Sequence, residues 1–169
     1  MQNVEYKSEL RDPDLCRALL ARAGARRIDR FEQVDTYFRV AEGRLKRRET
    51  PGLPVQYIRY DRANRLAPKI SRYELFTEEE ALARFGAAAL PVWLVVRKAR
   101  ELWLLANMRV HLDEVEGLGN FFEIEALVSP DYNLARCHEG IDQLRGALGV
   151  ALGEPIDGSY SDMIERHGA

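Results

Sequence analysis

The chain has 169 residues, of which 46% are hydrophobic, and this is long enough for one globular domain with its own core. Its 25 basic and 27 acidic residues give a net charge of -2, and such a balance argues against a general binder of nucleic acids or anionic membranes. Two cysteines without metal-ligand spacing, the lack of an apolar signal core and the lack of a membrane-spanning apolar run predict a cytoplasmic protein.

The first half of the chain predicts a strand, a helix and two hairpins. Residues 3–10 alternate between polar and apolar side chains, which is the pattern of a half-buried strand. Asp12 followed by Pro13 is a helix start, and the apolar stripe that follows ends at Gly24. Four further segments alternate in the same way and are joined by polar turns, so we expect strands at 33–40, 45–49, 56–62 and 69–76.

The second half predicts a short helix, a series of strands and a longer helix. Thr77 and Glu80 form a capping box that opens the short helix, and Gly86 closes it. The apolar positions of 134–148 recur with helical spacing. Strands are expected at 91–100, 102–106, 108–115 and 120–128, and a closing helical turn of structural function at 159–164.

Eight or nine short strands, mostly linked by hairpins, with three or four helices predict a single α+β domain over residues 1–169 with an antiparallel sheet. Each strand has one charged face and one apolar face that can pack against helices. Two arrangements fit this pattern. Either the charged face meets solvent, or the sheet closes into a barrel with the charges inside and the helices outside. A charged interior is costly unless it holds a charged ligand and ions.

Carboxylates gather in the segment 109–125, which reads as two strands joined by a Gly-containing turn. Glu123 and Glu125 share one face of the second strand about 7 Å apart, and carboxylates this close repel each other unless a cation lies between them. Clustered carboxylates suit Mg²⁺ or Mn²⁺, and surrounding Lys and Arg side chains suit a polyanion such as a triphosphate. The candidates for a common interior are the acids Glu5, Asp113, Glu123 and Glu125 and the bases Lys7, Lys46, Arg48, Arg59, Lys98, Arg100 and Arg109. His111 shares the charged face, and we expect it to be a hydrogen-bonded structural histidine.

Several ordered blocks of the chain carry a resemblance to a known family. Residues 3–7, Asn-Val-Glu-Tyr-Lys, resemble the N-terminal Glu-x-Glu-x-Lys signature of the CYTH superfamily, the triphosphate tunnel metalloenzymes that include class IV adenylate cyclases and thiamine triphosphatases. The closing residues 159–162 resemble the tail of bacterial proteins classed with the class IV adenylate cyclases. Between these ends, four blocks are similar to successive family blocks: 33–38, 43–49, 95–100 and 109–125.

The resemblance implies a closed tunnel of eight antiparallel strands with the charged faces inside and the helices outside. It also implies a divalent metal, Mg²⁺ or Mn²⁺, and a triphosphorylated substrate. Position by position, the four acids named above would bind the metal directly or through water, and the seven bases would hold phosphates. One position departs from the family pattern, because Asn3 replaces the first Glu of the signature and brings no charge to the metal.

Three functional hypotheses follow from the resemblance. The first is the class IV adenylate cyclase reaction, which converts ATP to cyclic AMP and pyrophosphate. The second is hydrolysis of a triphosphate such as thiamine triphosphate, a nucleoside triphosphate or tripolyphosphate. The third is a triphosphate- or nucleotide-binding module without catalysis. The oligomeric state is left open, a homodimer included.

Overall fold

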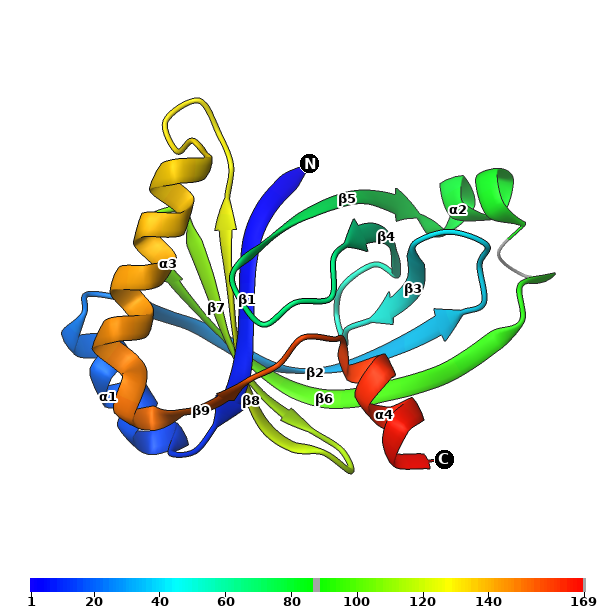
Figure 1. The fold of residues 1–169 in the computed structure, drawn as a ribbon. Helices are drawn as coiled ribbons and strands as arrows, with labels where there is room; N and C mark the ends of the chain where they lie inside the picture. The colour runs from blue at the N-terminus through cyan, green and yellow to red at the C-terminus, as the bar shows by residue number, and fades with distance from the viewer. Residues whose placement is uncertain (87–88, 169) are drawn as a thin grey trace.

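A computed structural model describes residues 1–86 and 89–168, and its fold is a closed antiparallel barrel (Figure 1). The strands are β1 (Gln2–Leu10), β2 (Arg26–Phe38), β3 (Arg44–Glu49), β4 (Gln56–Arg62), β5 (Lys69–Thr77), β6 (Val92–Leu105), β7 (Met108–Val115), β8 (Gly119–Leu127) and β9 (Leu152–Pro155). Eight of them follow one another round the barrel in the order β5-β4-β3-β2-β6-β7-β8-β1, and the pairing of β1 with β5 closes the ring. β9 pairs with the far end of β1. The predicted eight-stranded barrel is therefore confirmed.

Four α-helices and one 3-10 turn lie outside the ring in the described part of the chain (Figure 1). They are α1 (Pro13–Arg22), α2 (Glu78–Phe85), α3 (Leu134–Leu148), η2 (Gly149–Ala151) and α4 (Tyr160–Gly168). The expected caps are present: Asp12 accepts from the backbone N–H of Leu15, and Thr77 and Glu80 form the capping box. Within the described residues, no helix combines the length and apolar character needed to span a membrane.

Two hydrophobic cores lie between the outer face of the barrel and the helices, and a further cluster includes Tyr37, Tyr60 and Tyr160, which line the cavity. α1 and α3 cover β1, β7 and β8, where Val4, Val110 and Ile124 pack with Leu20 and Ile141. α2 covers a second, smaller core over β3 and β4. Because the buried apolar side chains of β1, β7 and β8 point outward under α1 and α3, the alternate side chains of these strands must point into the barrel. This is the physical reason why the charged faces become its interior.

Two strands are longer than the sequence predicts. β2 begins at Arg26, seven residues before the expected start, and the two segments expected at 91–100 and 102–106 form the single strand β6. The two strands pair along almost their whole length, with a register shift between Arg27 and Asp29. Most side chains in the first half of β2 are exposed on both faces, so its sequence lacks the apolar alternation that marks a half-buried strand.

Candidate active site in the barrel interior

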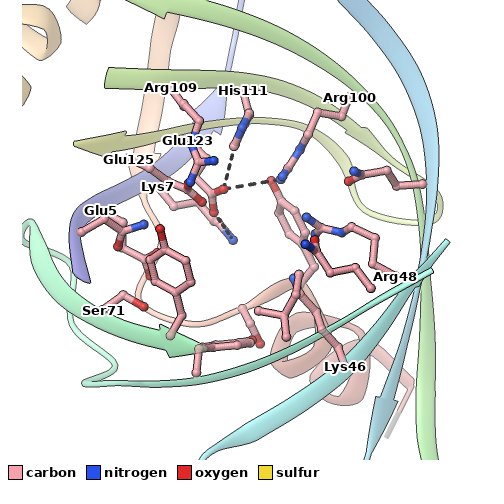
Figure 2. Close-up of a pocket in the computed structure, with 18 of the residues that line it drawn as sticks. Glu5, Lys7, Lys46, Arg48, Ser71, Arg100, Arg109, His111, Glu123 and Glu125 are labelled. Atoms are coloured by element: carbon pink, nitrogen blue, oxygen red, sulfur yellow. Dashed lines mark hydrogen bonds and ion pairs between the residues drawn. The ribbon is translucent and has the colours of Figure 1, made fainter. Parts of the chain in front are cut away.

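The barrel encloses a cavity of about 520 Å³, a size typical of small-molecule sites (Figure 2). Alternate side chains of all eight barrel strands reach it. Nine of the eleven charged residues expected in the interior line it: Glu5, Lys7, Lys46, Arg48, Lys98, Arg100, Arg109, Glu123 and Glu125. The other two, Asp113 and Arg59, do not.

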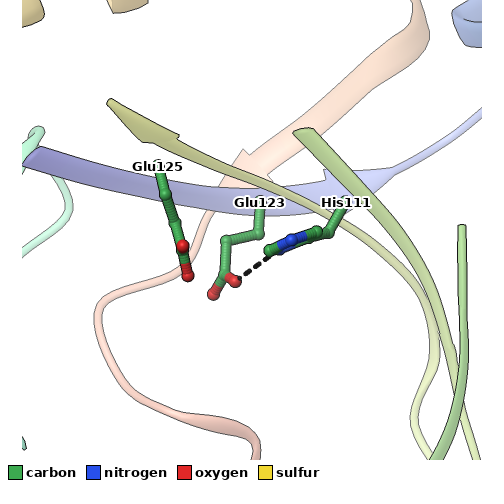
Figure 3. A group of neighbouring side chains, drawn as sticks. All are labelled: His111, Glu123 and Glu125. Carbon is green, nitrogen blue, oxygen red and sulfur yellow. Dashed lines mark hydrogen bonds and ion pairs between the residues drawn. The ribbon is translucent and has the colours of Figure 1, made fainter. Parts of the chain in front are cut away.

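One wall of the cavity carries a group of possible metal ligands, which we call the carboxylate–histidine group: His111, Glu123 and Glu125 (Figure 3). One ligating atom from each lies within 4.8 Å of the others. The register between β7 and β8 produces this arrangement, because it places His111 directly opposite Glu123. His111 Nδ1 lies 3.0 Å from Glu123 Oε1. Burial and the nearby Arg100 lower the pKa of His111, which favours the neutral imidazole that metals bind.

Glu123 is the most strongly held carboxylate of this group. Its oxygens lie 3.2 Å from Lys7 Nζ and 3.4 Å from Arg100 Nη2. Burial by itself would raise the pKa of Glu123, but Lys7, the hydrogen bond with His111 and the charge of Arg100 hold it well below the usual value. Glu125 accepts from Arg109 Nη2 at 2.9 Å, in a more open position. Glu123 is therefore held as an anion, and Glu125 presents its carboxylate to the cavity.

β1 adds two further oxygen-bearing side chains to this part of the cavity. Glu5 forms an ion pair with Arg62. Asn3 is buried, and its Oδ1 has no hydrogen-bond partner. Two carboxylates within reach of an imidazole, with Glu5 and an unsatisfied amide oxygen nearby, are a donor set that fits a divalent cation such as Mg²⁺ or Mn²⁺.

The basic cluster is formed by Lys46 and Arg48 of β3 and by Lys98 and Arg100 of β6. Figure 2 shows Lys46 and Arg48 away from the carboxylate–histidine group, whereas Arg100 reaches Glu123. β2 runs between these two strands and contributes Asp35. Arg48 donates to both oxygens of Asp35 at 2.8 Å, while Lys98 Nζ and Lys46 Nζ lie 2.9 and 3.2 Å from its Oδ2. Burial lowers the pKa of Lys98 to about 7 and, together with Arg48, that of Lys46 to about 8.

Asp113 lies outside the carboxylate–histidine group, although the sequence predicts it as a metal ligand. Arg100 donates to both of its oxygens at 2.7 Å, and the hydroxyl group of Tyr160 donates to Oδ2 at 2.7 Å. Burial would raise the pKa of Asp113, but Arg100 lowers it to about 2. These are the contacts of a residue that positions Arg100 and holds α4 against the end of the barrel, which agrees with the structural role expected of 159–164.

The predicted phosphate-binding role of Arg59 is wrong, because the side chain of Arg59 points away from the cavity. In β4 the inward side chains are Ile58, Tyr60 and Arg62, so Arg59 lies on the outer face, 3.8 Å from Glu74. The sequence pattern predicted the wrong face because both faces of this short strand carry an arginine. Arg62 occupies the inward position instead and pairs with Glu5.

Sequence reasoning missed two further site residues and misjudged a third. Asp35 and Arg62 were not among the candidates, and His111 was expected to be a hydrogen-bonded structural histidine in preference to a base. Asp35 did leave a signal, since it is an acid on a polar strand face between two strands whose inward residues are basic. The sequence also carried a signal for His111. This residue lies two positions after Arg109, so both share one face of the strand, and the next strand carries two acids. Its hydrogen bond to Glu123 agrees with the expectation, but its place among the possible ligands goes beyond it.

Comparison with known proteins supports the same fold. Residues 1–151 match the sequence profile of the CYTH domain. No curated protein sequence matches the chain. Among solved structures, the PH1012 protein of Pyrococcus horikoshii superposes with a TM-score of 0.74 at 20% identity, covering 95% of this chain and 98% of that one. A Vibrio parahaemolyticus protein provisionally named an adenylate cyclase superposes with a TM-score of 0.73 at 16% identity, covering 96% and 97%. A Hippeastrum protein provisionally named an adenylyl cyclase, and described as having a dominant triphosphatase activity, gives a TM-score of 0.63 at 16% identity, covering 98% and 96%. At these identities the likeness concerns the fold.

Proposed function

This chain belongs to the CYTH domain family, and from that premise we propose that it is a metal-dependent enzyme that transfers phosphoryl groups of a triphosphorylated substrate. The family's enzymes act on triphosphates and depend on a divalent metal. The proposal for this chain rests on its own cavity as well as on its family.

One observation supports the proposal above the others: the carboxylate–histidine group and the basic cluster line a single cavity, in which Arg100 lies between the two groups. Phosphoryl transfer depends mainly on positioning the phosphates and on neutralising their charge. The basic cluster, with Lys7 and Arg109, supplies cationic donors for a phosphate chain. The carboxylate–histidine group supplies ligands for the divalent cation that accompanies the phosphate chain.

We assign the metal to Glu123, Glu125 and His111, with Glu5 as a further oxygen ligand reached directly or through water. A bound Mg²⁺ or Mn²⁺ would polarise a phosphoryl oxygen and lower the pKa of bound water. Lys7 and Arg100 contact Glu123 and hold it in its anionic form. The imidazole of His111 makes Mn²⁺ a better fit than Mg²⁺, which prefers ligand sets made of oxygen alone.

The first reaction that we propose is the class IV adenylate cyclase reaction. The 3′-hydroxyl of ATP attacks the α-phosphorus, the bond between the α-phosphorus and its bridging oxygen breaks, and pyrophosphate leaves with the negative charge. The proton of the hydroxyl group passes to solvent or to a nearby base. Apolar side chains also line the cavity and can accommodate an organic group beside the phosphates: Phe31, Ile58, Leu75, Leu102 and Leu127.

Hydrolysis is the second candidate, and the unsatisfied oxygen of Asn3 favours it. Water bound beside the carboxylate–histidine group would attack the terminal phosphorus, and the rest of the chain would leave as a diphosphate. Asn3 Oδ1 is buried, lines the cavity and can accept a hydrogen bond from such a water. This reaction needs the cationic side chains that bind phosphates, but it needs no pocket for a nucleobase.

A product assay decides between the reactions. The protein is incubated with ATP, and separately with tripolyphosphate, in the presence of Mg²⁺ or Mn²⁺. Cyclic AMP with pyrophosphate supports the cyclase, whereas ADP with phosphate supports the hydrolase. Tight binding of both compounds without turnover would contradict catalysis and leave the binding module.

Free buried thiols at Cys16 and Cys137 are compatible with the cytoplasmic setting that we propose.

The metal assignment has a test that does not depend on activity. Mn²⁺ binding is followed by electron paramagnetic resonance, and we expect weaker binding after Glu125→Gln and after His111→Gln. A matched control is Glu114→Gln, since Glu114 is an exposed acid of β7 that does not line the cavity. Equal Mn²⁺ affinity in all three variants would exclude this ligand set.

A further inference from the structure

Asp35 is an acid at the centre of the basic cluster that does not reach the cavity. Its side chain is 0% exposed, and it is absent from the cavity lining, whereas Lys46, Arg48 and Lys98 all line the cavity. The carboxylate therefore lies behind the three cations as seen from the cavity. Its position follows from the strand order, because β2 lies between the strands that carry these bases.

The three cations keep hydrogen-bond donors for a ligand while they bind Asp35. Arg48 uses Nε and Nη2 for the carboxylate, which leaves its other guanidinium N–H groups. Lys98 and Lys46 each place one ammonium group against Oδ2, and an ammonium group has three N–H donors. One buried anion thus fixes three flexible side chains without using up their donors. The charge that remains is about two positive units, which suits a polyanion.

The lysines need this anion in order to remain charged inside the barrel. The charged groups that face Lys98 are Asp35 from β2, Lys46 and Arg48 from β3, Arg100 from its own strand and, more distantly, Asp113 from β7, while the ring of Tyr160 from α4 lies 5.7 Å away. Burial and the three neighbouring cations favour loss of the Lys98 proton, and Asp35 opposes it.

Lys46 has similar neighbours. Arg48 and Arg100 favour loss of its proton, Asp35 and Glu123 oppose it, and the ring centroids of Tyr37 and Tyr60 lie 5.6 Å from its ammonium group. Asp35 is thus the one carboxylate that contacts both ammonium groups in the described structure.

We propose that Asp35 is a positioning residue for the phosphate-binding side of the cavity, which holds Arg48, Lys46 and Lys98 in place and keeps both lysines protonated. This inference rests on the proposed function, because it assigns the basic cluster to phosphates. It goes beyond that function by giving the buried acid an indirect role: Asp35 contacts no substrate, yet the affinity of the site for a polyphosphate depends on it.

The test is the variant Asp35→Asn, which keeps the shape of the side chain and removes its charge. Binding of inorganic tripolyphosphate is measured by calorimetry at pH 5 and pH 7 for the variant and the unchanged protein. We expect an affinity loss of about tenfold at pH 7, where Lys46 and Lys98 depend on Asp35 for their charge, and a smaller loss at pH 5, where the lysines of the variant regain their protons. The ratio of the two proteins at each pH removes the titration of tripolyphosphate itself.

Glu101→Gln is a matched control. Glu101 is also a buried, paired carboxylate of the barrel wall, but it binds Arg17 and Trp103 on the outer face. We expect this variant to lose stability without a pH-dependent change in tripolyphosphate affinity. A loss in Asp35→Asn that is the same at both pH values, or tighter binding caused by the removal of a negative charge, would overturn the proposal.

A second variant covers the case in which Asp35→Asn does not fold. Asp35→Glu keeps the charge but moves the carboxylate by one methylene group, so we expect weaker tripolyphosphate binding at pH 5 and pH 7 alike, because position alone has changed. Unchanged affinity would contradict the positioning role. If the unchanged protein fails to bind tripolyphosphate, the proposed function itself fails, and this outcome is distinct from any result with the variants.

Discussion

The two walls of the cavity use carboxylates in different ways. Asp35 and Asp113, which hold the basic cluster, have side chains that are 0% exposed, and cations contact both oxygens of each. In the carboxylate–histidine group, Glu125 keeps 17% of its side chain exposed and pairs with Arg109, itself 37% exposed. Glu123 is intermediate, since Lys7 and Arg100 contact its two oxygens but its side chain lines the cavity. Acids of equal charge therefore differ in availability. A carboxylate enclosed by cations can position them, whereas one that faces the cavity can still bind a metal.

The largest expected effect tests the metal-binding wall. Glu123→Gln removes a charge from the carboxylate–histidine group, and we expect kcat to fall about a thousandfold because the metal loses an anionic ligand. The measurement is the product assay with ATP and tripolyphosphate, with circular dichroism to check the fold. Glu114→Gln is the control, since that acid lies outside the cavity. Turnover that stays unchanged in Glu123→Gln would remove the distinction between the walls.

The next prediction concerns stability and contrasts an enclosed acid with an open one. Asp113→Asn removes the anion that binds the buried Arg100 at 2.7 Å and leaves only the 3.4 Å contact with Glu123, so we expect the free energy of unfolding to fall by about 3 kcal/mol. Glu125→Gln breaks a partly exposed pair and should cost about 1 kcal/mol or less. Urea denaturation of both variants measures the difference. Equal losses would show that burial does not separate the two kinds of acid.

The pKa of Asp113 gives the same prediction a pH dependence. Because Arg100 holds this pKa at about 2, below the usual 3.8, the folded state favours the anion. The stabilisation by Asp113 is therefore complete above about pH 4 and is lost as the pH falls towards 2. In Asp113→Asn, this part of the acid destabilisation should be missing.

A smaller effect is expected in the basic wall, where binding should change more than chemistry. Arg48→Gln removes a phosphate-binding charge, and we expect KM to rise about thirtyfold with little change in kcat. Arg47→Gln is a matched control, because Arg47 is the next residue on β3 and pairs with Glu49 and Glu78 on the outer face. Steady-state kinetics would contradict the assignment if the two variants behaved alike.

The smallest effect is a pH dependence of the basic wall. Lysines bind phosphate in their charged form, which exists below the pKa, so kcat/KM should fall several-fold as the pH rises through about 7 and 8, the pKa values of Lys98 and Lys46. Lys98→Arg replaces the group of lower pKa by one that stays charged, and its profile should be flatter above pH 7. A profile identical to that of the unchanged protein would exclude Lys98 as the titrating group.

Much of the fold could be predicted because its signals are local. The alternation of residues 3–10, the capping box at Thr77 and the helical spacing of 134–148 each depend on neighbours in sequence, and each element is present. The start of β2 was missed because that part of the strand extends where both faces are exposed. β9 was also missed, since its four residues become a strand by pairing with the end of β1.

Prediction of the site was less complete, because strand parity says which residues share a face but not which face points inward. Parity placed Glu123 with Glu125 and Lys46 with Arg48, as the structure does. It failed for Arg59, where inward and outward faces both carry arginine. It could not show that the oxygens of Asp113 would be occupied by Arg100 and Tyr160, which is 47 residues away in the sequence.

The sequence by itself therefore determined a single antiparallel domain of charged strand faces, the family, and most of the residues that meet in the cavity. The tertiary structure decided the partners: His111 beside Glu123, Arg62 on Glu5, and Asp35 behind three cations. The physical reason is distance. Alternation and capping act over a few residues of one strand or helix, whereas the charge state and availability of an acid depend on which cations the closed barrel brings within about 3 Å of it.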